Sequence, residues 1–375
     1  MNDNTSKTNL WRLLIKAVIL FILFNLIFAF SSPQQILGKL SVYNSLVPGR
    51  ERLPFGENPA EAYNLSLYNL EAMFSSHEIS GIDKSENEFR VFLIGDSSTW
   101  GFYLENEDTL SNILNRSELE TAEGKDIEFY NFGYPTISLT KDLMILDRVL
   151  EYQPNLIIWL VTLESFPYEK QIFTPLVQQN PEFVKPLIEQ YSINIDPNSE
   201  LFINETFWEK TIIGQRRQIA DVLRLQFYAP LWAATGIDQY IPDEYKLRAE
   251  DLDPIDDYYG FAPPTLSRND LAFDVMSAGI EHADQIPVLI VNEPIFVSQG
   301  ENSDIRYDFF YPRWAYDSYR QLLATETEDN GWAYIDLWQA VDNTEFTNSA
   351  IHLSPEGSAQ LADQLIPKIL EIINN

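Results

Sequence analysis

Residues 92–101 read Phe92-Leu93-Ile94-Gly95-Asp96-Ser97-Ser98-Thr99-Trp100-Gly101. A short apolar run ends at Ile94 and passes directly into a small, polar turn. An open α/β sheet places its chemistry at the carboxyl ends of its strands, so a hydroxyl group in this turn is positioned to react. The stretch therefore predicts a buried strand followed by a candidate nucleophile, Ser97.

Four more apolar runs share the length and character of this strand. Each is short and mostly continuous, as expected of strands that are buried on both faces. The five predicted strands are 89–94, 127–132, 156–163, 286–291 and 332–337. Helical patterns lie between them at 108–115, 139–152, 208–227 and 315–325, and a last helix begins after Ser354-Pro355. This alternation predicts an α/β domain with a parallel sheet and helices on both of its faces.

Residues 1–30 form a separate unit. Lys7, Arg12 and Lys16 precede or enter a long apolar run that is about long enough to span a bilayer. Because the basic residues lie on its amino side, the positive-inside rule places the amino terminus in the cytoplasm and the bulk of the chain outside. We expect an uncleaved, single-pass transmembrane anchor. The alternative is a cleaved signal peptide, and either one exports the rest of the chain.

The remainder divides into two predicted parts. Residues 31–86 contain several prolines and lack strong periodicity, so we interpret them as a stalk with lead-in helices. Residues 87–375 carry the five strands of the α/β domain. A long segment between the third and fourth strands, 167–275, is a predicted insertion. We expect it to cap the carboxyl ends of the strands, and the alternative is a lateral subdomain away from them.

Charge and composition limit the kinds of partner and cofactor that we expect for this chain. The chain has a net charge of −31 and no cysteine among its 375 residues. An acidic surface repels nucleic acid, and the lack of cysteine excludes disulfides, thiolate metal sites and cysteine nucleophiles. The three histidines lack metal-ligand spacing, and no glycine-rich phosphate loop is present. We therefore expect no cofactor, no metal and no nucleic-acid partner.

A serine needs a base to act as a nucleophile at neutral pH, and one histidine is well placed to supply it. His77 precedes the sheet, and His282 comes just before the fourth strand, at the opposite edge. His352 follows the fifth strand, in a loop immediately before the last helix. Ser97 and His352 are therefore expected at the same edge of the sheet, as a catalytic pair.

The chain resembles the SGNH (GDSL-type) hydrolase superfamily in two blocks. They are Gly95-Asp96-Ser97 after the first strand and His352-Leu353-Ser354-Pro355-Glu356-Gly357 before the last helix. The resemblance covers roughly residues 88–166 and 284–373. It implies a flavodoxin-like three-layer α/β fold with Ser97 as nucleophile and His352 as base. Together with the amino-terminal anchor, the chain also resembles exported bacterial proteins that move acyl groups on cell-envelope polysaccharides.

Two positions of the implied oxyanion hole depart from the family. The resemblance implies backbone N–H donors at Ser97 and at a glycine, which is Thr136 here, and a backbone N–H survives that change. The asparagine side-chain donor of the family is replaced by Glu164, and a carboxylate repels an oxyanion. Thr162 or Asn292 are alternative donors. An alternative reading of Glu164 is that it pairs with a basic residue and does no chemistry.

The partner of the histidine also departs from the family. The family places an aspartate three residues before the histidine, and this chain has Ser349 there, preceded by Asn348. Losing that aspartate costs on the order of 10,000-fold where a triad depends on it. A backbone carbonyl can orient the imidazole instead, which leaves a Ser–His dyad. Glu293, Glu164 or Asp342 could supply a carboxylate from elsewhere, and Asn348 is a further candidate to orient the base or contact substrate.

These observations predict an exported serine esterase or O-acyltransferase that acts on acyl esters of an envelope glycan. The expected partners are the acylated glycan, the membrane and an integral-membrane acyltransferase. The alternative hypothesis is a catalytically weak or inactive relative that binds polysaccharide or serves as an accessory protein.

Overall fold

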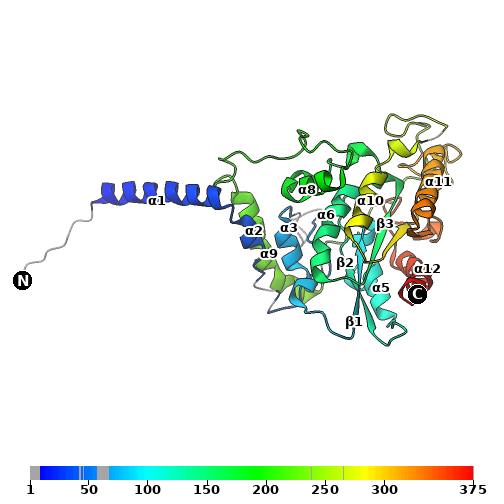
Figure 1. Cartoon of the computed structure of the whole chain (residues 1–375), viewed down its shortest axis with the longest axis horizontal. Coiled ribbons are helices and arrows are strands. Elements are labelled where there is room, and N and C mark those ends of the chain that lie inside the picture. Colours follow the sequence, from blue (N-terminus) through cyan, green and yellow to red (C-terminus); the bar gives the residue numbers. More distant parts are fainter. Residues whose placement is uncertain are drawn as a thin grey trace, which may run out of the picture.

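A computed structural model describes residues 9–374, apart from 42, 43, 45, 57–66, 238 and 265; Lys7 lies outside the described residues. The centre of the molecule is a five-stranded, all-parallel sheet with strand order β2-β1-β3-β4-β5 (Figure 1). Its strands are β1 (Glu88–Ile94), β2 (Asp126–Asn131), β3 (Leu156–Val161), β4 (Val288–Asn292) and β5 (Ala333–Asp336). They overlap the five predicted runs, and the strand order is the flavodoxin-like one, so the predicted fold class is confirmed.

Helices cover both faces of this sheet. The α-helices of the described residues are α1 (Leu10–Ser31), which extends away from the sheet (Figure 1), α2 (Gln34–Gly38), α3 (Leu70–Ser76), α4 (Ser97–Trp100), α5 (Leu110–Arg116), α6 (Leu139–Val149), α7 (Pro175–Gln178), α8 (Pro181–Tyr191), α9 (Arg216–Thr235), α10 (Phe273–His282), α11 (Arg313–Asn330) and α12 (Pro355–Ile373). By its length and composition, α1 fits a membrane anchor or a signal sequence.

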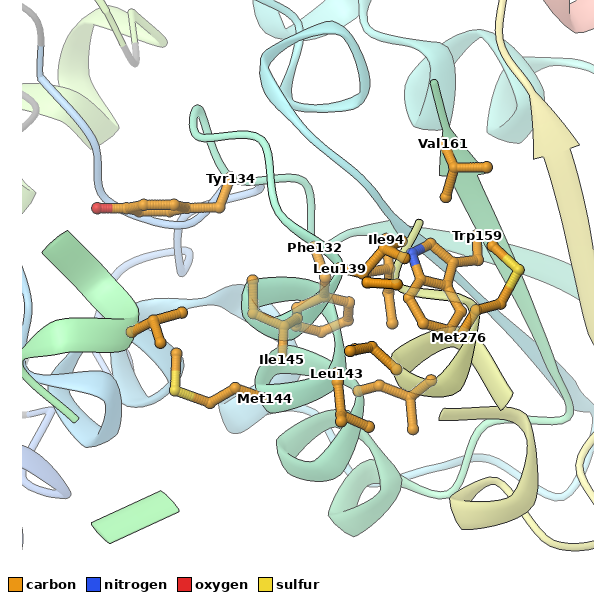
Figure 2. Close-up of a cluster of buried hydrophobic side chains, with 14 of the residues drawn as sticks. Ile94, Phe132, Tyr134, Leu139, Leu143, Met144, Ile145, Trp159, Val161 and Met276 are labelled. Carbon is orange, nitrogen blue, oxygen red and sulfur yellow. The ribbon is translucent and has the colours of Figure 1, made fainter. Parts of the chain in front are cut away.

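The strands are buried on both faces, as their continuous apolar sequences require. Phe92 and Ile94 of β1 pack on the side of α6, α10 and α11, where Figure 2 shows part of the larger core. Val91 and Leu93 point to the other side and pack with side chains of α5 and α12. Burying one large apolar side chain stabilises the fold by about 1.5–3 kcal/mol. The two cores therefore fix the strand register, and with it the positions of the loops at the carboxyl edge.

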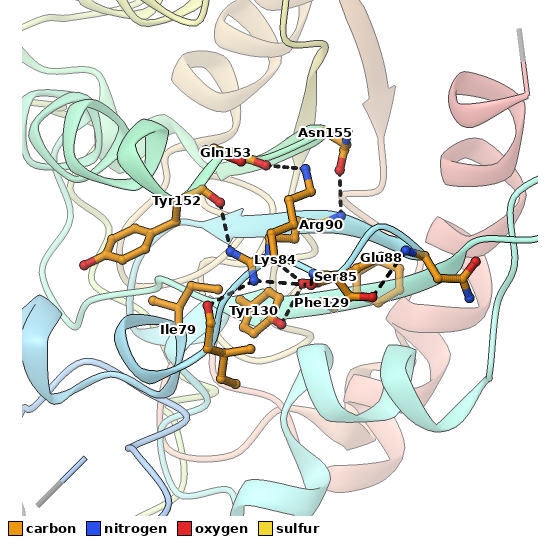
Figure 3. Close-up of polar contacts among 12 residues, drawn as sticks. Ile79, Lys84, Ser85, Glu88, Arg90, Phe129, Tyr130, Tyr152, Gln153 and Asn155 are labelled. Carbon is orange, nitrogen blue, oxygen red and sulfur yellow. Dashed lines mark hydrogen bonds and ion pairs between the residues drawn. The ribbon is translucent and has the colours of Figure 1, made fainter. Parts of the chain in front are cut away.

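Arg90 organises the opposite, amino edge of the sheet (Figure 3). Its guanidinium group pairs with Glu88 at 2.5 Å and donates to the carbonyl oxygens of Tyr152 (3.1 Å) and Ile82 (3.2 Å). Its backbone N–H donates to Asn155 Oδ1 at 2.9 Å. Partners on every side satisfy this buried charge. The amino edge is therefore occupied by structural contacts, and the carboxyl edge is left for chemistry.

Helix α9 differs from its prediction, because it begins and ends about eight residues later than 208–227. Residues 207–215 form turns, and Gly214 is packed so closely against the Glu209 backbone that a Cβ would collide with it. The helix then continues through Pro230 and ends at Gly236, which has φ 67°. A proline removes only one helical hydrogen bond, and the turn chemistry of Gly236 sets the end.

The segment predicted as a stalk contributes to the main core. Leu53, together with Leu70, Met73 and Phe74 of α3, is buried in the same cluster as the side chains of α6. Those described residues of 31–86 therefore pack as part of the α/β body.

Candidate active site

The carboxyl end of β1 holds Ser97 in a tight turn. Gly95 leaves no room for a side chain, because a Cβ there would collide with Thr99 and approach a carbonyl of neighbouring β3. Asp96 caps α4 by accepting the Ser98 N–H at its Oδ1 (2.8 Å). Ser97 is the first residue of α4, where the strand order reverses between β1 and β3. Open α/β sheets bind their ligands at this switch point.

The loop between β5 and α12 brings His352 to Ser97. His352 Nε2 lies 2.7 Å from Ser97 Oγ, within hydrogen-bond distance. Thr347 closes the loop by donating its N–H to the His352 carbonyl oxygen at 2.8 Å. Ser354 caps α12 by accepting the Gly357 N–H at 3.1 Å. The structure therefore brings together the two residues that the sequence predicts as nucleophile and base.

Asn348 holds the other side of the imidazole. His352 Nδ1 lies 2.8 Å from Asn348 Oδ1. An amide oxygen only accepts, so this contact places the ring proton on Nδ1 and leaves Nε2 to accept the Ser97 hydroxyl hydrogen. Asn348 is one residue before Ser349, the position of the family aspartate in the sequence comparison, and it occupies the place next to the ring.

Burial sets the protonation state of His352. The residue is 9% exposed, and the Phe102 ring stacks on it with centroids 4.7 Å apart and an interplanar angle of 24°. Burial lowers the pKa of His352 to about 4, because an apolar environment disfavours the charged ring. The imidazole is therefore neutral near pH 7, which is the state that a general base requires.

Lys141 supports the turn from beneath and was not predicted from the sequence. Its side chain is fully buried in the first turn of α6, where Nζ donates to the carbonyl oxygens of Gly95 (2.6 Å) and Tyr134 (3.3 Å). It also pairs with Asp142 Oδ1 at 2.5 Å. One ammonium group thus ties together the loops that follow β1 and β2. The sequence gives no clear signal for this role, because α6 begins Leu139-Thr140-Lys141-Asp142, which is mostly polar.

Asp96 and Glu293 are buried beside each other under the same turn, 4% and 1% exposed. Burial raises the pKa of Asp96 to about 6. Burial and the nearby charge of Asp96 raise the pKa of Glu293 well above its ordinary value. Two buried carboxyl groups in contact do not both ionise readily, so this site favours the protonated form of Glu293. Glu293 was a candidate to orient the histidine, but that position is occupied by Asn348.

The candidate oxyanion donors differ in their availability. Ser97 lies at the first position of α4, where a backbone N–H has no acceptor within its own helix. The Thr136 N–H donates to the Tyr134 carbonyl oxygen at 2.6 Å, whereas the Thr136 hydroxyl is buried without a partner among the described residues. The Thr162 hydroxyl bonds to the Tyr311 hydroxyl at 2.8 Å, within the core.

Glu164 is held by partners of its own. Its carboxylate pairs with Lys170 and accepts hydrogen bonds from the Tyr258 and Tyr259 hydroxyl groups. The lysine compensates the negative charge that replaces the family asparagine. These contacts agree with the alternative in which Glu164 pairs with a basic residue.

Asn292 belongs to a polar network in the core. Its Oδ1 accepts from the Tyr319 hydroxyl at 3.1 Å, and its Nδ2 donates to Asp336 Oδ1 at 2.8 Å. Both polar atoms of this amide are therefore engaged away from Ser97. The sequence shows that Asn292 lies at the end of β4. It does not show that tyrosine hydroxyl groups of α11 bond to the Asn292 side chain.

Part of the insertion crosses the sheet edge near this site. The ring of Tyr245, in the insertion, stacks on the ring of Tyr103, with centroids 5.2 Å apart. Tyr103 lies six residues after Ser97. Arg248 donates to the carbonyl oxygens of Phe346 (2.7 Å) and Asn343 (3.1 Å), at the start of the loop that carries His352. The earlier part, α8, packs beside α6. The insertion therefore has both a segment over the edge and a lateral segment.

The other two histidines have structural partners. His77 Nε2 lies 3.1 Å from the carbonyl oxygens of Glu51 and Asn131, and His282 Nε2 lies 2.8 Å from Asp147. Within the described residues, no three histidine or carboxylate side chains converge in a way that could hold a metal ion.

No family model matches the chain, and no curated protein matches it. Solved structures that are similar to this chain include three of esterase or lipolytic proteins. They are a carbohydrate acetylesterase family member from Sinorhizobium meliloti (11% identity, 76% of this chain and 98% of that chain, TM-score 0.35), a member of the lipolytic protein G-D-S-L family from Veillonella parvula DSM 2008 (10%, 74% and 97%, TM-score 0.35) and the aryl esterase of M. smegmatis (12%, 76% and 99%, TM-score 0.34).

The strand order, the serine turn after β1 and the histidine loop before α12 are described directly by the structure. These features bring Ser97 and His352 together, and they agree with the resemblance of the sequence to the SGNH, or GDSL-type, hydrolase superfamily.

Proposed function

We propose that this protein is an exported, membrane-anchored serine esterase or O-acyltransferase that acts on acyl esters of a cell-envelope glycan. One observation carries the proposal. Ser97 Oγ lies 2.7 Å from His352 Nε2, and the opposite ring nitrogen is held by Asn348 at 2.8 Å. A nucleophile in contact with a base that is itself oriented is the arrangement that acyl transfer needs.

The proposed reaction has two steps. In the first, Ser97 Oγ bonds to the acyl carbon while His352 Nε2 takes the hydroxyl proton. The ester bond then breaks, and His352 returns the proton to the departing oxygen. In the second, water or a sugar hydroxyl attacks the acyl-serine, with His352 again taking and returning a proton. Hydrolysis and transfer differ only in that acceptor, so they share these residues.

Two donors support the oxyanion in this proposal. The Ser97 N–H is free of a helical acceptor, and the Thr136 hydroxyl is buried without a partner among the described residues. One well-placed donor accounts for about 100- to 1,000-fold in rate. The Lys170 ammonium group compensates Glu164, so the carboxylate repels an oxyanion less than a lone charge would.

The proposed location and substrate rest on α1 and on the aromatic residues at the edge. α1 supplies 22 residues of apolar helix, and the basic residues on its amino side favour an outward-facing domain. Tyr103 and Tyr245 stack on each other near His352, and Phe102 stacks on the histidine itself. Such rings pack well on the apolar faces of sugars. A glycan ester at the outer face of the membrane fits this combination.

A second candidate function is that of a catalytically weak accessory protein that binds polysaccharide. The observation in its favour is the incomplete oxyanion hole. The Thr136 N–H is engaged by Tyr134, and Glu164 stands where the family has an asparagine donor. This candidate predicts glycan binding without covalent chemistry at Ser97.

The test is covalent labelling of the full chain, in detergent, with a fluorophosphonate probe. We expect labelling that is abolished in Ser97→Ala and slowed about 100- to 10,000-fold in His352→Ala, since the base provides that much. Ser98→Ala is the matched control, and it should label normally. Release of acetate from acetylated polysaccharide then tests the glycan substrate. A folded wild-type chain that never labels would contradict the esterase and favour the accessory protein.

A further inference from the structure

Helix α9 has an outward face of unusual composition. The exposed positions along it include Arg216, Leu223, Arg224, Phe227, Pro230 and Leu231. Phe227 is 74% exposed, Leu223 53% and Leu231 49%, and they follow one another at intervals of four residues. The chain has 56 acidic against 25 basic residues, yet the exposed charged residues of α9 are three arginines, Arg216, Arg217 and Arg224. The opposite face of α9 buries Leu225, Ala229 and Trp232.

This helix lies at the end of α1. Figure 1 shows α9 (green) next to α2, just beyond the carboxyl end of α1 (blue). One cavity is lined both by Ser32 and Gln34, which follow α1, and by Gln218 of α9. The outward face of α9 therefore begins where the apolar anchor ends.

The turn before α9 reaches along the last turns of α1. The Ile213 N–H donates to Asn25 Oδ1 at 3.4 Å, and the rings of Phe207 and Phe30 lie 5.3 Å apart. Asn25 interrupts the apolar helix, and this contact helps to satisfy its amide. At about 1.5 Å per residue, Asn25 lies about 9 Å inside the end of α1. A segment that contacts it therefore lies in the outer leaflet when α1 spans a bilayer.

We propose that the outward face of α9, together with the exposed Trp208, docks on the outer surface of the bilayer that α1 spans. The proposal rests on the membrane anchoring given under Proposed function, but it does not require Ser97 to be catalytic. A helix of this composition lies in the plane of the interface with its apolar side chains among the acyl chains and its arginines at the phosphates. Tryptophan is enriched at the same level.

Continuity with α1 identifies lipid as the occupant of this face. A helix that begins beside a transmembrane segment meets the headgroup region before it meets any soluble partner. Three exposed arginines in an acidic protein match lipid phosphate groups, although Arg224 also pairs with Asp221 at 2.9 Å. Leu223, Phe227 and Leu231 supply the apolar area. Because the apolar side chains provide most of the binding, we expect docking to depend weakly on salt.

Docking would also hold the candidate active site near the membrane. Just beyond the carboxyl end of α9, Gln239 Nε2 donates to the carbonyl oxygens of Gly101 (2.9 Å) and Leu104 (3.1 Å). Those carbonyls belong to the loop that directly follows α4 and Ser97. The helix that faces lipid is thus connected to the serine turn by a short, bonded segment. This favours an acyl ester presented at the membrane surface over one that is free in solution.

The experiment uses the full chain in nanodiscs of phosphatidylcholine, with one copy in each disc. The sequence has no cysteine, so Phe227→Cys carries a single environment-sensitive fluorophore, and Ala324→Cys on exposed α11 is the matched control. We expect a blue-shifted emission and several-fold stronger quenching by spin-labelled lipid at position 227 than at position 324. Adding Leu223→Glu and Leu231→Glu to the labelled 227 variant should reduce that quenching.

Equal quenching at the two positions would overturn the proposal and leave the face to a protein partner or a second copy. A chain that does not enter the discs would overturn the anchoring and, with it, the docking. Fluorophosphonate labelling of the same samples reports on Ser97 separately, so failure of docking and failure of the esterase are distinguishable.

Discussion

The protonation state of one histidine decides what the candidate site can do. His352 is buried under Phe102, and its Nδ1 is held by the neutral amide of Asn348. Burial lowers its pKa to about 4, so the ring is available as a base at every physiological pH. The same environment gives little support to the imidazolium that forms when Ser97 attacks. A base far below the working pH is a weak one, because catalysis is best when the pKa lies near that pH.

Asn348→Asp should therefore improve the site. A carboxylate 2.8 Å from Nδ1 favours the charged ring, and we expect it to raise the pKa of His352 by about 1–3 units. In the pH profile of kcat/KM for a simple ester, the midpoint of the acid limb should move up from about pH 4 by the same amount. The value of kcat/KM at pH 8 should rise. Asn348→Ala removes the half-buried acceptor of the ring proton, and it should lower kcat/KM by about 5- to 150-fold without raising the limb. An unchanged acid limb in Asn348→Asp would mean that the amide does not orient the ring.

The local sequence pattern predicted the strands and the Ser97–His352 pair. Each strand, and each of the two motifs that carry Ser97 and His352, consists of a few consecutive residues. The apolar runs specify five buried strands, and the two motif blocks lie at strand and helix ends. The contacts of Asn348, Thr136 and Glu164 depend on which loops meet in space, so the sequence left them as alternatives. The predicted bounds of α9 were wrong for a different reason. Gly214 and Gly236 set the ends of this helix, and Pro230 does not break it.

At the scale of elements, α6 connects the core to the site. Lys141, in its first turn, donates to carbonyl oxygens in the loops that follow β1 and β2, and it pairs with Asp142. Lys141→Met leaves a buried carboxylate without its partner, and we expect the free energy of unfolding to fall by about 3–5 kcal/mol. Urea denaturation followed by tryptophan fluorescence measures this loss.

An exposed ion pair is the control for that variant. Lys368 pairs with Glu371 at 3.1 Å on the surface of α12, so Lys368→Met should change stability by about 1 kcal/mol or less. Adding Asp142→Leu to Lys141→Met should restore part of the loss, because no unpaired charge then remains buried. Equal losses in the two lysine variants would show that the buried ammonium group is not what holds the loops.

At the scale of the whole molecule, the excess of acidic residues extends into the interior. Burial raises the pKa of Glu78 and of Asp308 to about 8 and that of Asp96 to about 6, and Glu293 is raised as well. Each raised pKa means that the folded chain keeps a proton that the unfolded chain releases at about pH 4 to 5. Folding therefore takes up protons near neutral pH, in a protein whose net charge is −31.

We expect stability to fall as the pH rises from about 6 to about 8.5. Each proton held only by the folded state contributes a slope of up to about 1.4 kcal/mol per pH unit. His352 acts in the opposite direction: its lowered pKa means that stability is lost as the pH falls from 6.5 to about 4. The two effects place the optimum on the acid side of neutrality. Urea midpoints of the full chain in detergent at pH 5, 6, 7 and 8.5 measure the profile.

Asp308→Asn tests the origin of that profile. Asp308 Oδ1 accepts the backbone N–H groups of Phe310 (2.7 Å) and Tyr311 (3.1 Å), and an asparagine oxygen keeps both bonds without a titrating group. The variant should therefore lose less stability than the wild type between pH 6 and pH 8.5. Asp363→Asn, on the exposed surface of α12, is the control and should keep the wild-type slope. A wild-type midpoint that rises with pH over this range would contradict the assignment, because buried carboxyl groups with raised pKa values can only make the folded state weaker as they ionise.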